Sequence, residues 1–266
     1  MSAKQSEIEG EENESDEAQS EFDNARDEFI KLSKAFGPSD FFQKCESVAT
    51  DCETFIEKWP ETERGLSLGS LHVRFESLHD ESKQSMGDPD RPGFLQSLTR
   101  LEHRAADLHE SNLEQEIENT CDSLRERDID FSSQCKSQSG SNRELQNVMT
   151  HYTASNGLRF HHTTARETAI GVLGLLSSGV RGRSTSGPTI GLNAPEHLTR
   201  LADSRTAADP LFRDIRGRLL KMTQEGSECS AEAEAISDLL GEQQSGMNGL
   251  CELVEELNRV RAIRRS

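Results

Sequence analysis

The chain has 266 residues, with 30 Lys and Arg against 48 Asp and Glu, and a formal net charge of −18. Its apolar content of 32% is low beside the roughly 45–50% (counting Gly) of ordinary globular chains. A thin core and a strongly acidic surface argue against a large α/β fold and against nucleic-acid binding over most of the surface.

Apolar residues recur every three or four positions along most of the chain, which is typical of helices. The pattern predicts an all-α protein of multi-helix bundle modules, with a disordered acidic N-terminal tail and a C-terminal amphipathic, coiled-coil-like helix. Residues 1–17 are rich in Glu and Asp and hold almost nothing to bury, so they are expected to be the disordered tail.

Residues 18–131 are expected to form an acidic helical domain. Four segments have helical apolar stripes, and a breaker that contains Gly or Pro ends each of the first three. The last and longest segment has a change of phase at Ser111-Asn112. Residues 132–142 (SSQCKSQSGSN) lack any periodicity, which predicts a linker.

Residues 143–222 predict a basic, Gly- and Arg-containing helical region. From His151 to Met222 there are ten Lys and Arg against five Asp and Glu. Gly171 and Gly174 interrupt an apolar helix and indicate a close helix crossing, because each interior glycine lowers helix stability. Residues 177–194 are expected to be a mobile loop. Asp209 as N-cap and Pro210 at the first position predict the start of the next helix.

This reversal of charge predicts the site at which a negatively charged partner binds, because guanidinium groups bind oxyanions in bidentate fashion. RNA or another polyanion at residues 151–222 is one alternative, although stacking aromatics are scarce there. Neutralisation of the cations by the chain's own carboxylates is another. His161 and His162 are expected to be partly exposed and to gain charge near pH 6. The expected anion- or partner-binding residues are Arg159, Arg166, Arg181, Arg183, Arg213, Arg216, Arg218 and Lys221.

Within the expected loop, Arg183-Ser184-Thr185-Ser186-Gly187-Pro188 resembles the R-S-x-S-x-P motif that adaptors of the 14-3-3 family read when its second serine is phosphorylated. The resemblance covers six residues and implies a phospho-dependent protein partner. It makes Ser184, Ser186 and Pro188 the phospho-motif.

Residues 223–266 predict a C-terminal helix for oligomerisation or for a partner. A seven-residue rhythm favours a homo-oligomer, and Gln243 is its single polar layer, which sets register and partner number in coiled coils. A helical hairpin broken at 241–249, where three glycines occur, is the alternative. The expected oligomerisation residues are Ile236, Leu240, Gln243, Met247, Leu250, Val254 and Leu257. A central Gln between apolar layers also resembles the Gln-class SNARE motif, which implies a helical-bundle component.

Six Cys without C-x-x-C spacing, and no signal peptide, predict free buried thiols in an intracellular, cytoplasmic or nuclear protein. The longest apolar run, Ala169–Leu176, is too short to span a bilayer, which needs about 20 residues. No catalytic motif is present, so no catalytic residue, metal or cofactor is expected and the chain is not expected to be an enzyme.

The favoured hypothesis is a non-catalytic helical interaction or scaffold protein that oligomerises through its C-terminal helix. It would bind an anionic or phospho-dependent partner through the basic region. The order of acidic tail, helical modules and oligomerising helix also resembles negative-strand virus polymerase cofactors (phosphoproteins) or matrix-like proteins. That resemblance implies association with RNA or nucleoprotein.

Overall fold

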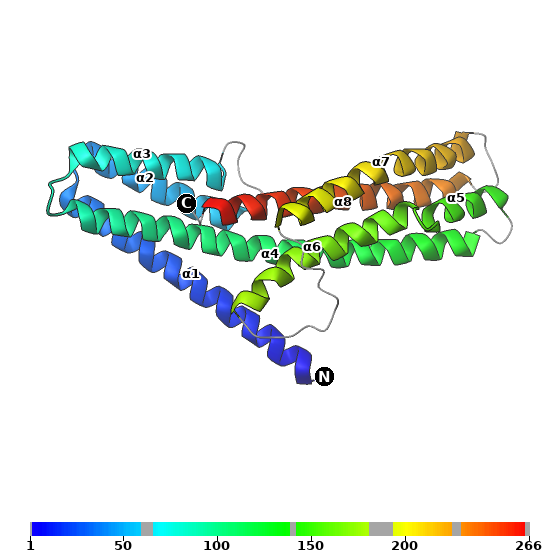
Figure 1. Ribbon diagram of the computed structural model, residues 1–266, viewed down its shortest axis with the longest axis horizontal. Coiled ribbons are helices and arrows are strands. Elements are labelled where there is room, and N and C mark those ends of the chain that lie inside the picture. Colours follow the sequence, from blue (N-terminus) through cyan, green and yellow to red (C-terminus); the bar gives the residue numbers. More distant parts are fainter. Residues whose placement is uncertain (1, 60–65, 139–141, 181–193, 225–229, 264–266) are drawn as a thin grey trace. The chain divides into compact units, whose positions relative to one another are not determined.

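The computed structural model describes residues 2–59, 66–138, 142–180, 194–224 and 230–263. These residues form α-helices and no strand, which confirms the expected all-α class (Figure 1). No described helix is both long and apolar enough to cross a membrane. The helices are α1 (Ser2–Phe36), α2 (Ser39–Lys58), α3 (Leu68–Ser85), α4 (Arg91–Gln138), α5 (Arg143–Thr153), α6 (Leu158–Val180), α7 (Ala194–Gln224) and α8 (Ser230–Ile263).

The chain divides into two compact units. Unit 1 comprises Met1–Asn112 and Arg259–Ser266, and unit 2 comprises Leu113–Asn258. The division falls where the apolar stripe of α4 changes phase, at Ser111-Asn112, and not at the expected linker. A helix whose apolar stripe changes direction must find different packing partners on the two sides of the change.

Unit 1 is a bundle of α1, α2, α3 and the first part of α4. Its core contains a cluster of aromatic rings in which Phe94 of α4 lies 5.5 Å from Phe29 of α1 and 5.4 Å from Phe41 of α2, centroid to centroid. Helix α3 begins with a capping box, in which Ser67 and Ser70 exchange side-chain and backbone hydrogen bonds. Such a cap satisfies amide groups that the first turn leaves unpaired.

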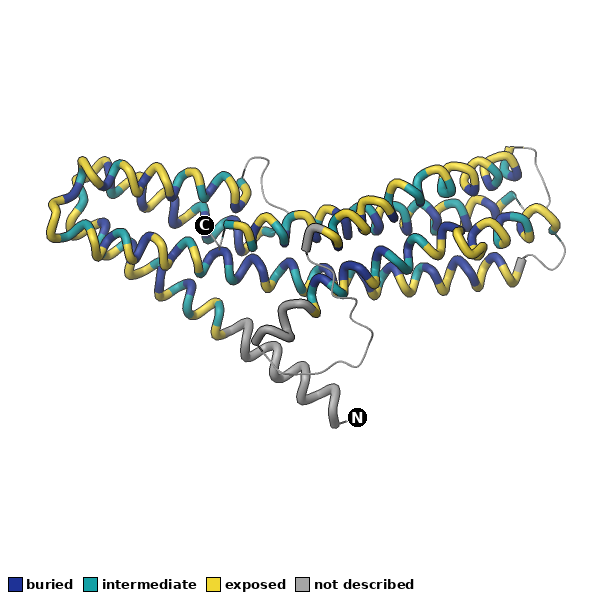
Figure 2. The backbone as a smooth tube through the Cα atoms, viewed as in Figure 1, coloured by how far each residue is buried: buried dark blue, intermediate teal, exposed yellow. Residues whose placement is uncertain are grey.

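Unit 2 packs α5, α6 and α7 with the second part of α4 and most of α8, and each helix turns a buried stripe inward (Figure 2). Tyr152 is fully buried against Phe131, with ring centroids 4.1 Å apart. Helices α6 and α7 cross closely at Gly171, where an added Cβ would lie 3.1 Å from Cε1 of His197. The close crossing expected at Gly171 is therefore present, whereas at Gly174 a Cβ would meet no atom within 4 Å.

The end of α4 differs from the one expected. Helix α4 continues to Gln138, because Phe131 and Cys135 are four residues apart and both fully buried. The predicted linker 132–142 is thus helical over residues 132–138, and Asn142 caps α5 by accepting hydrogen bonds from the amides of Glu144 and Leu145. The sequence did not predict this extension, because two apolar residues, Phe131 and Cys135, in a polar, serine-rich run are too few to reveal a helical period.

Helix α7 begins at Ala194 and passes through Pro210, which is therefore not at a helix start. A proline inside a helix removes one hydrogen bond and costs about 3 kcal/mol. Leu201 and Ala208 in the preceding turns are buried, so packing favours the helix on the N-terminal side of Pro210. The side chain of Asp209 caps nothing and instead accepts a hydrogen bond from Nε2 of Gln244 on α8 at 2.7 Å.

Helix α8 is continuous across residues 241–249, so the alternative of a broken hairpin is wrong. Close packing explains one of the three glycines in this stretch, because a Cβ at Gly246 would lie 2.9 Å from Cδ2 of Leu124 on α4. At the N-terminus, the backbone of residues 2–17 is helical and continues into α1, whereas their composition predicts disorder. Among the described side chains of α1, the first buried one is that of Phe22.

Candidate interaction face on helix α7

Two of the basic residues expected to bind a partner, Arg159 and Arg166, belong to α6. Nε of Arg159 donates to Oδ2 of Asp128 at 3.1 Å. Arg166 is partly buried, and its backbone carbonyl lies 4.0 Å from Sγ of Cys121 on α4. Neutralisation by an internal carboxylate, the alternative considered from sequence, is therefore what happens at Arg159.

Asp128 belongs to a buried polar cluster that joins three helices. The hydroxyl of Tyr152 on α5 donates to Oδ1 of Asp128 at 2.7 Å and accepts from Nε2 of Gln243 on α8 at 3.0 Å. Burial, reinforced by the Asp128 carboxylate, raises the pKa of Tyr152 far above its usual value. The phenol therefore stays protonated, and the cluster holds α4, α5 and α8 in one register.

His162 of α6 is buried near the same carboxylate. Burial lowers the pKa of His162 to about 4, with Asp128 acting in the opposite direction. The expectation of two partly exposed imidazoles is therefore wrong for His162, which is only 4% exposed. His161 alone is partly exposed.

The remaining described basic residues of the expected set lie on α7. Nε of Arg218 pairs with Oδ2 of Asp214 at 3.0 Å, and Nδ1 of His151 on α5 lies 3.8 Å from the same oxygen. Arg213 and Arg216 are exposed and have different surroundings. Nε of Arg213 donates to the backbone carbonyl of Asp209 at 3.3 Å, and the guanidinium carbon of Arg216 lies 5.9 Å from the centroid of the Phe212 ring.

Helical spacing places Arg213, Gly217, Leu220 and Gln224 along the middle of one face, because they are separated by three or four residues. All four are exposed, while Ile215, Leu219 and Met222 are buried on the opposite side. Arg216 and Lys221 flank the exposed row and are also exposed. We call the six residues Arg213, Arg216, Gly217, Leu220, Lys221 and Gln224 the α7 face.

Two members of the α7 face were not expected from sequence. Leu220 is 52% exposed, although it adjoins the buried Leu219 and so looks like a core residue. Gly217 lies in the interior of a long helix, and a Cβ there would meet no atom within 4 Å. Packing within the part of the chain that the structure describes therefore explains neither residue. A helical wheel drawn over residues 209–222 could have found them, because Gly217 and Leu220 fall on the face opposite Ile215, Leu219 and Met222.

The seven residues expected to make an oligomer are buried within the single chain. Each has a relative exposure of 0%, and Ile236 and Leu240 pack in the core of unit 2 with Tyr152 and Ile215. Gln243 is indeed a buried polar layer, but its partner is the chain's own Tyr152. The stripe therefore acts in folding, and it presents no open face of the kind that an oligomer or a SNARE-like bundle requires.

The expected phospho-motif, Ser184, Ser186 and Pro188, lies outside the described residues, as do the expected binding residues Arg181 and Arg183.

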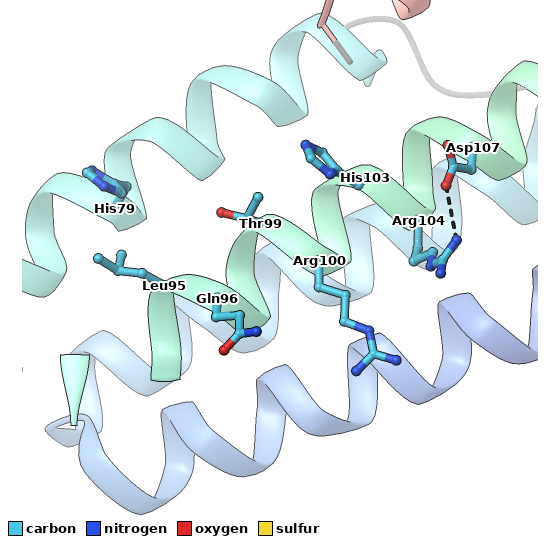
Figure 3. A pocket seen from close by; sticks show the side chains of 8 residues that line it. All are labelled: His79, Leu95, Gln96, Thr99, Arg100, His103, Arg104 and Asp107. Carbon is cyan, nitrogen blue, oxygen red and sulfur yellow. Dashed lines mark hydrogen bonds and ion pairs between the residues drawn. The ribbon is translucent and has the colours of Figure 1, made fainter. Parts of the chain in front are cut away.

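A groove in unit 1 was also not expected from sequence. It runs along α4 beside His79 of α3, with Thr99 and His103 on one side of the helix and Arg100 and Arg104 on the other (Figure 3). Nη1 of Arg100 pairs with Glu28 of α1 at 2.8 Å, and Nη1 of Arg104 pairs with Glu21 at 2.8 Å. These cations are neutralised by the chain itself, so the groove is a weaker candidate for binding an anion than the α7 face.

The five described cysteines are free and buried, as expected for thiols that serve packing. Burial raises the pKa of Cys45, Cys52 and Cys135 to about 12. It raises the pKa of Cys121 and Cys251 to about 11. Among the described residues, no group of three His, Cys, Asp or Glu is placed to hold a metal ion.

A search found no family model, curated protein or solved structure that matches this chain. Fold and site therefore define only a class, a two-unit all-α protein in which an exposed face of α7 combines arginines with a leucine.

Proposed function

We propose that this chain is a non-catalytic helical interaction protein that binds an acidic protein partner on the α7 face. The observation that carries the proposal is the environment of Arg213 and Arg216. Both are exposed, and within the part of the chain that the structure describes neither guanidinium pairs with a carboxylate. In a chain of net charge −18, such cations are a local reversal of the surface potential.

Electrostatics supports a partner of opposite charge. A basic patch on an acidic protein attracts a negatively charged surface, so it contributes to association rate and specificity. Residues 205–221 contain five basic and two acidic side chains. The two acids, Asp209 and Asp214, are already engaged by Gln244 and Arg218.

RNA is less well supported as the partner. Single-strand binders stack bases on exposed aromatic rings. On α7 the only aromatic side chain is Phe212, which packs against the core of unit 2 and lies beneath the guanidinium of Arg216. A peptide carboxylate needs no such stacking platform, because a guanidinium binds it through paired hydrogen bonds.

The test is retention of the full-length chain on immobilised poly-L-glutamate across a salt series. We expect the double variant Arg213→Glu/Arg216→Glu to lose at least about tenfold in apparent affinity. Retention of the unaltered chain should also weaken as salt rises, because exposed charges are screened within about 10 Å at 0.1 M.

The matched control reverses two exposed arginines elsewhere in unit 2, in the variant Arg125→Glu/Arg143→Glu. It changes the net charge by the same amount but leaves the α7 face intact, so its retention should follow the unaltered chain. Equal losses in the two variants would mean that only net charge matters, and the assignment to α7 would be wrong. Tighter retention on polyuridylate than on poly-L-glutamate would point to RNA instead.

A further inference from the structure

The α7 face contains a feature that charge does not explain. Gly217 lies at the centre of the face in the interior of α7, where glycine is among the least favourable residues for a helix. A Cβ at this position would meet no atom within 4 Å, so no close contact within the described residues requires glycine there. By contrast, Gly171 and Gly246 have such contacts, with His197 and Leu124.

Leu220 lies one turn from Gly217 on the same face and is 52% exposed. An exposed leucine by itself is ordinary. Here, however, it stands at the centre of the face, directly beside the position that lacks a side chain, and is flanked by Arg216 and Lys221. The face therefore has a gap in its row of side chains at Gly217, here called the notch, with the exposed Leu220 beside it and the basic Arg216 and Lys221 on either side.

We propose that the α7 face receives an acidic amphipathic helix of a partner protein, which crosses α7 at Gly217. This inference rests on the proposed function and names the shape of the partner. The absence of a side chain lets a second helix approach closely, as small residues do at tight helix crossings. An apolar residue of the partner would cover Leu220, while its carboxylates pair with Arg213 and Arg216.

A second copy of the chain is excluded as the occupant of the same face in a symmetric dimer. A two-fold interface brings each residue close to the equivalents of its neighbours, so Arg213, Arg216 and Lys221 would face one another. Like charges placed opposite each other oppose association. The occupant must therefore carry acids where this helix carries cations.

Two peptides of identical Glu, Leu and Ala composition provide the probe. One has its leucines in a single stripe at helical spacing, and the other has them distributed around the helix. With the full-length chain, fluorescence anisotropy should show the striped peptide binding at least about tenfold more tightly. The net charge of the two peptides is equal, so the difference reports the shape of the site.

The decisive variant is Gly217→Ala. It should raise thermal stability, because alanine favours the helix, and should weaken binding of the striped peptide by at least about tenfold because the new methyl group fills the notch. The control is Gly241→Ala in α8, where a Cβ also meets no atom within 4 Å. It should raise stability similarly and leave peptide binding unchanged.

The outcomes separate the two proposals. If the chain retains poly-L-glutamate through Arg213 and Arg216 but binds both peptides equally, the helix-shaped site is wrong and the acidic-partner function stands. If the Gly217→Ala variant binds the striped peptide as tightly as the unaltered chain does, the proposal that the partner helix crosses α7 at Gly217 is also wrong. If the chain binds neither peptide nor poly-L-glutamate, both proposals fail.

Discussion

Tyr152 on α5 and Asp128 on α4 are joined by a hydrogen bond of 2.7 Å in the interior of unit 2. Gln243 on α8 donates to the same phenol at 3.0 Å, and Arg159 on α6 donates to the other oxygen of Asp128 at 3.1 Å. One residue from each of four helices thus meets in a single polar layer. Buried polar groups are stable only when their partners are present.

Removing the phenol hydroxyl should therefore destabilise unit 2. Tyr152→Phe leaves a carboxylate oxygen and an amide buried without this partner, which costs about 1–3 kcal/mol in free energy of unfolding. Urea denaturation followed by circular dichroism measures the loss. The double variant Tyr152→Phe/Gln243→Leu should lose less than the sum of the single variants, because the two residues are coupled. Strict additivity would show that the hydrogen bond contributes little.

Stability should depend on pH through His162. In the folded chain the pKa of His162 is lowered by burial to about 4 from the usual 6.5, so only the unfolded chain takes up a proton between these values. Stability is then complete above about pH 6.5 and falls as the pH drops towards 4, by at most about 1.4 kcal/mol per pH unit.

The measurement for His162 is the free energy of unfolding between pH 7 and pH 5, compared with His162→Gln, which cannot titrate. The variant should be less pH-dependent than the unaltered chain. Asp128, Arg166 and His161 are the charged or titratable groups that influence His162, and all three remain in the variant. Parallel pH profiles would contradict the assignment.

Two glycines of α8 should respond in opposite ways to alanine. Gly249→Ala should stabilise the chain by up to about 1 kcal/mol, because a Cβ there meets no atom within 4 Å and alanine is the better helix former. Gly246→Ala should gain nothing or lose stability, because its Cβ would lie 2.9 Å from Cδ2 of the buried Leu124. Thermal melts of the two variants decide this, and equal gains would mean that α4 and α8 are not in close contact at Gly246.

The apolar stripe of α8 should behave as a core and not as a subunit interface. Leu240 is fully buried in the core of unit 2, so Leu240→Asp should reduce the helical signal in circular dichroism at every protein concentration. An oligomer interface would instead give a folded chain of lower mass in sedimentation equilibrium. Leu220→Asp is the matched control, and it should leave the fold intact because Leu220 is exposed.

The described cysteines should resist alkylation in the native chain. Their thiols are buried and their pKa values are raised by burial to about 11–12, and the thiolate is the reactive form. Iodoacetamide at pH 8 followed by peptide mass spectrometry should label Cys52 and Cys121 slowly in buffer and rapidly in urea. Equal rates in both conditions would show that these residues are accessible.

Much of the fold could be predicted from sequence because apolar periodicity is local. The stripes of Phe22–Phe36 and Leu68–Leu78 predict their helices without knowledge of any partner, and Gly37-Pro38 separates α1 from α2 by removing the helical hydrogen bond. The change of phase at Ser111-Asn112 is equally local, but the sequence placed it inside a single domain 18–131, and only the structure shows that the two units divide there.

Tertiary structure decided which polar and apolar residues face solvent. The sequence shows that Arg159, Arg213 and Arg216 are basic. Only the tertiary structure gives Arg159 a carboxylate partner, Asp128, while the other two pair with no carboxylate of the described residues. In the same way, the heptad stripe predicts that Leu240 and Leu250 are buried. It does not indicate whether the same chain or another chain buries them. Contacts between helices far apart in sequence settle both questions, because burial and pairing depend on neighbours that no local pattern specifies.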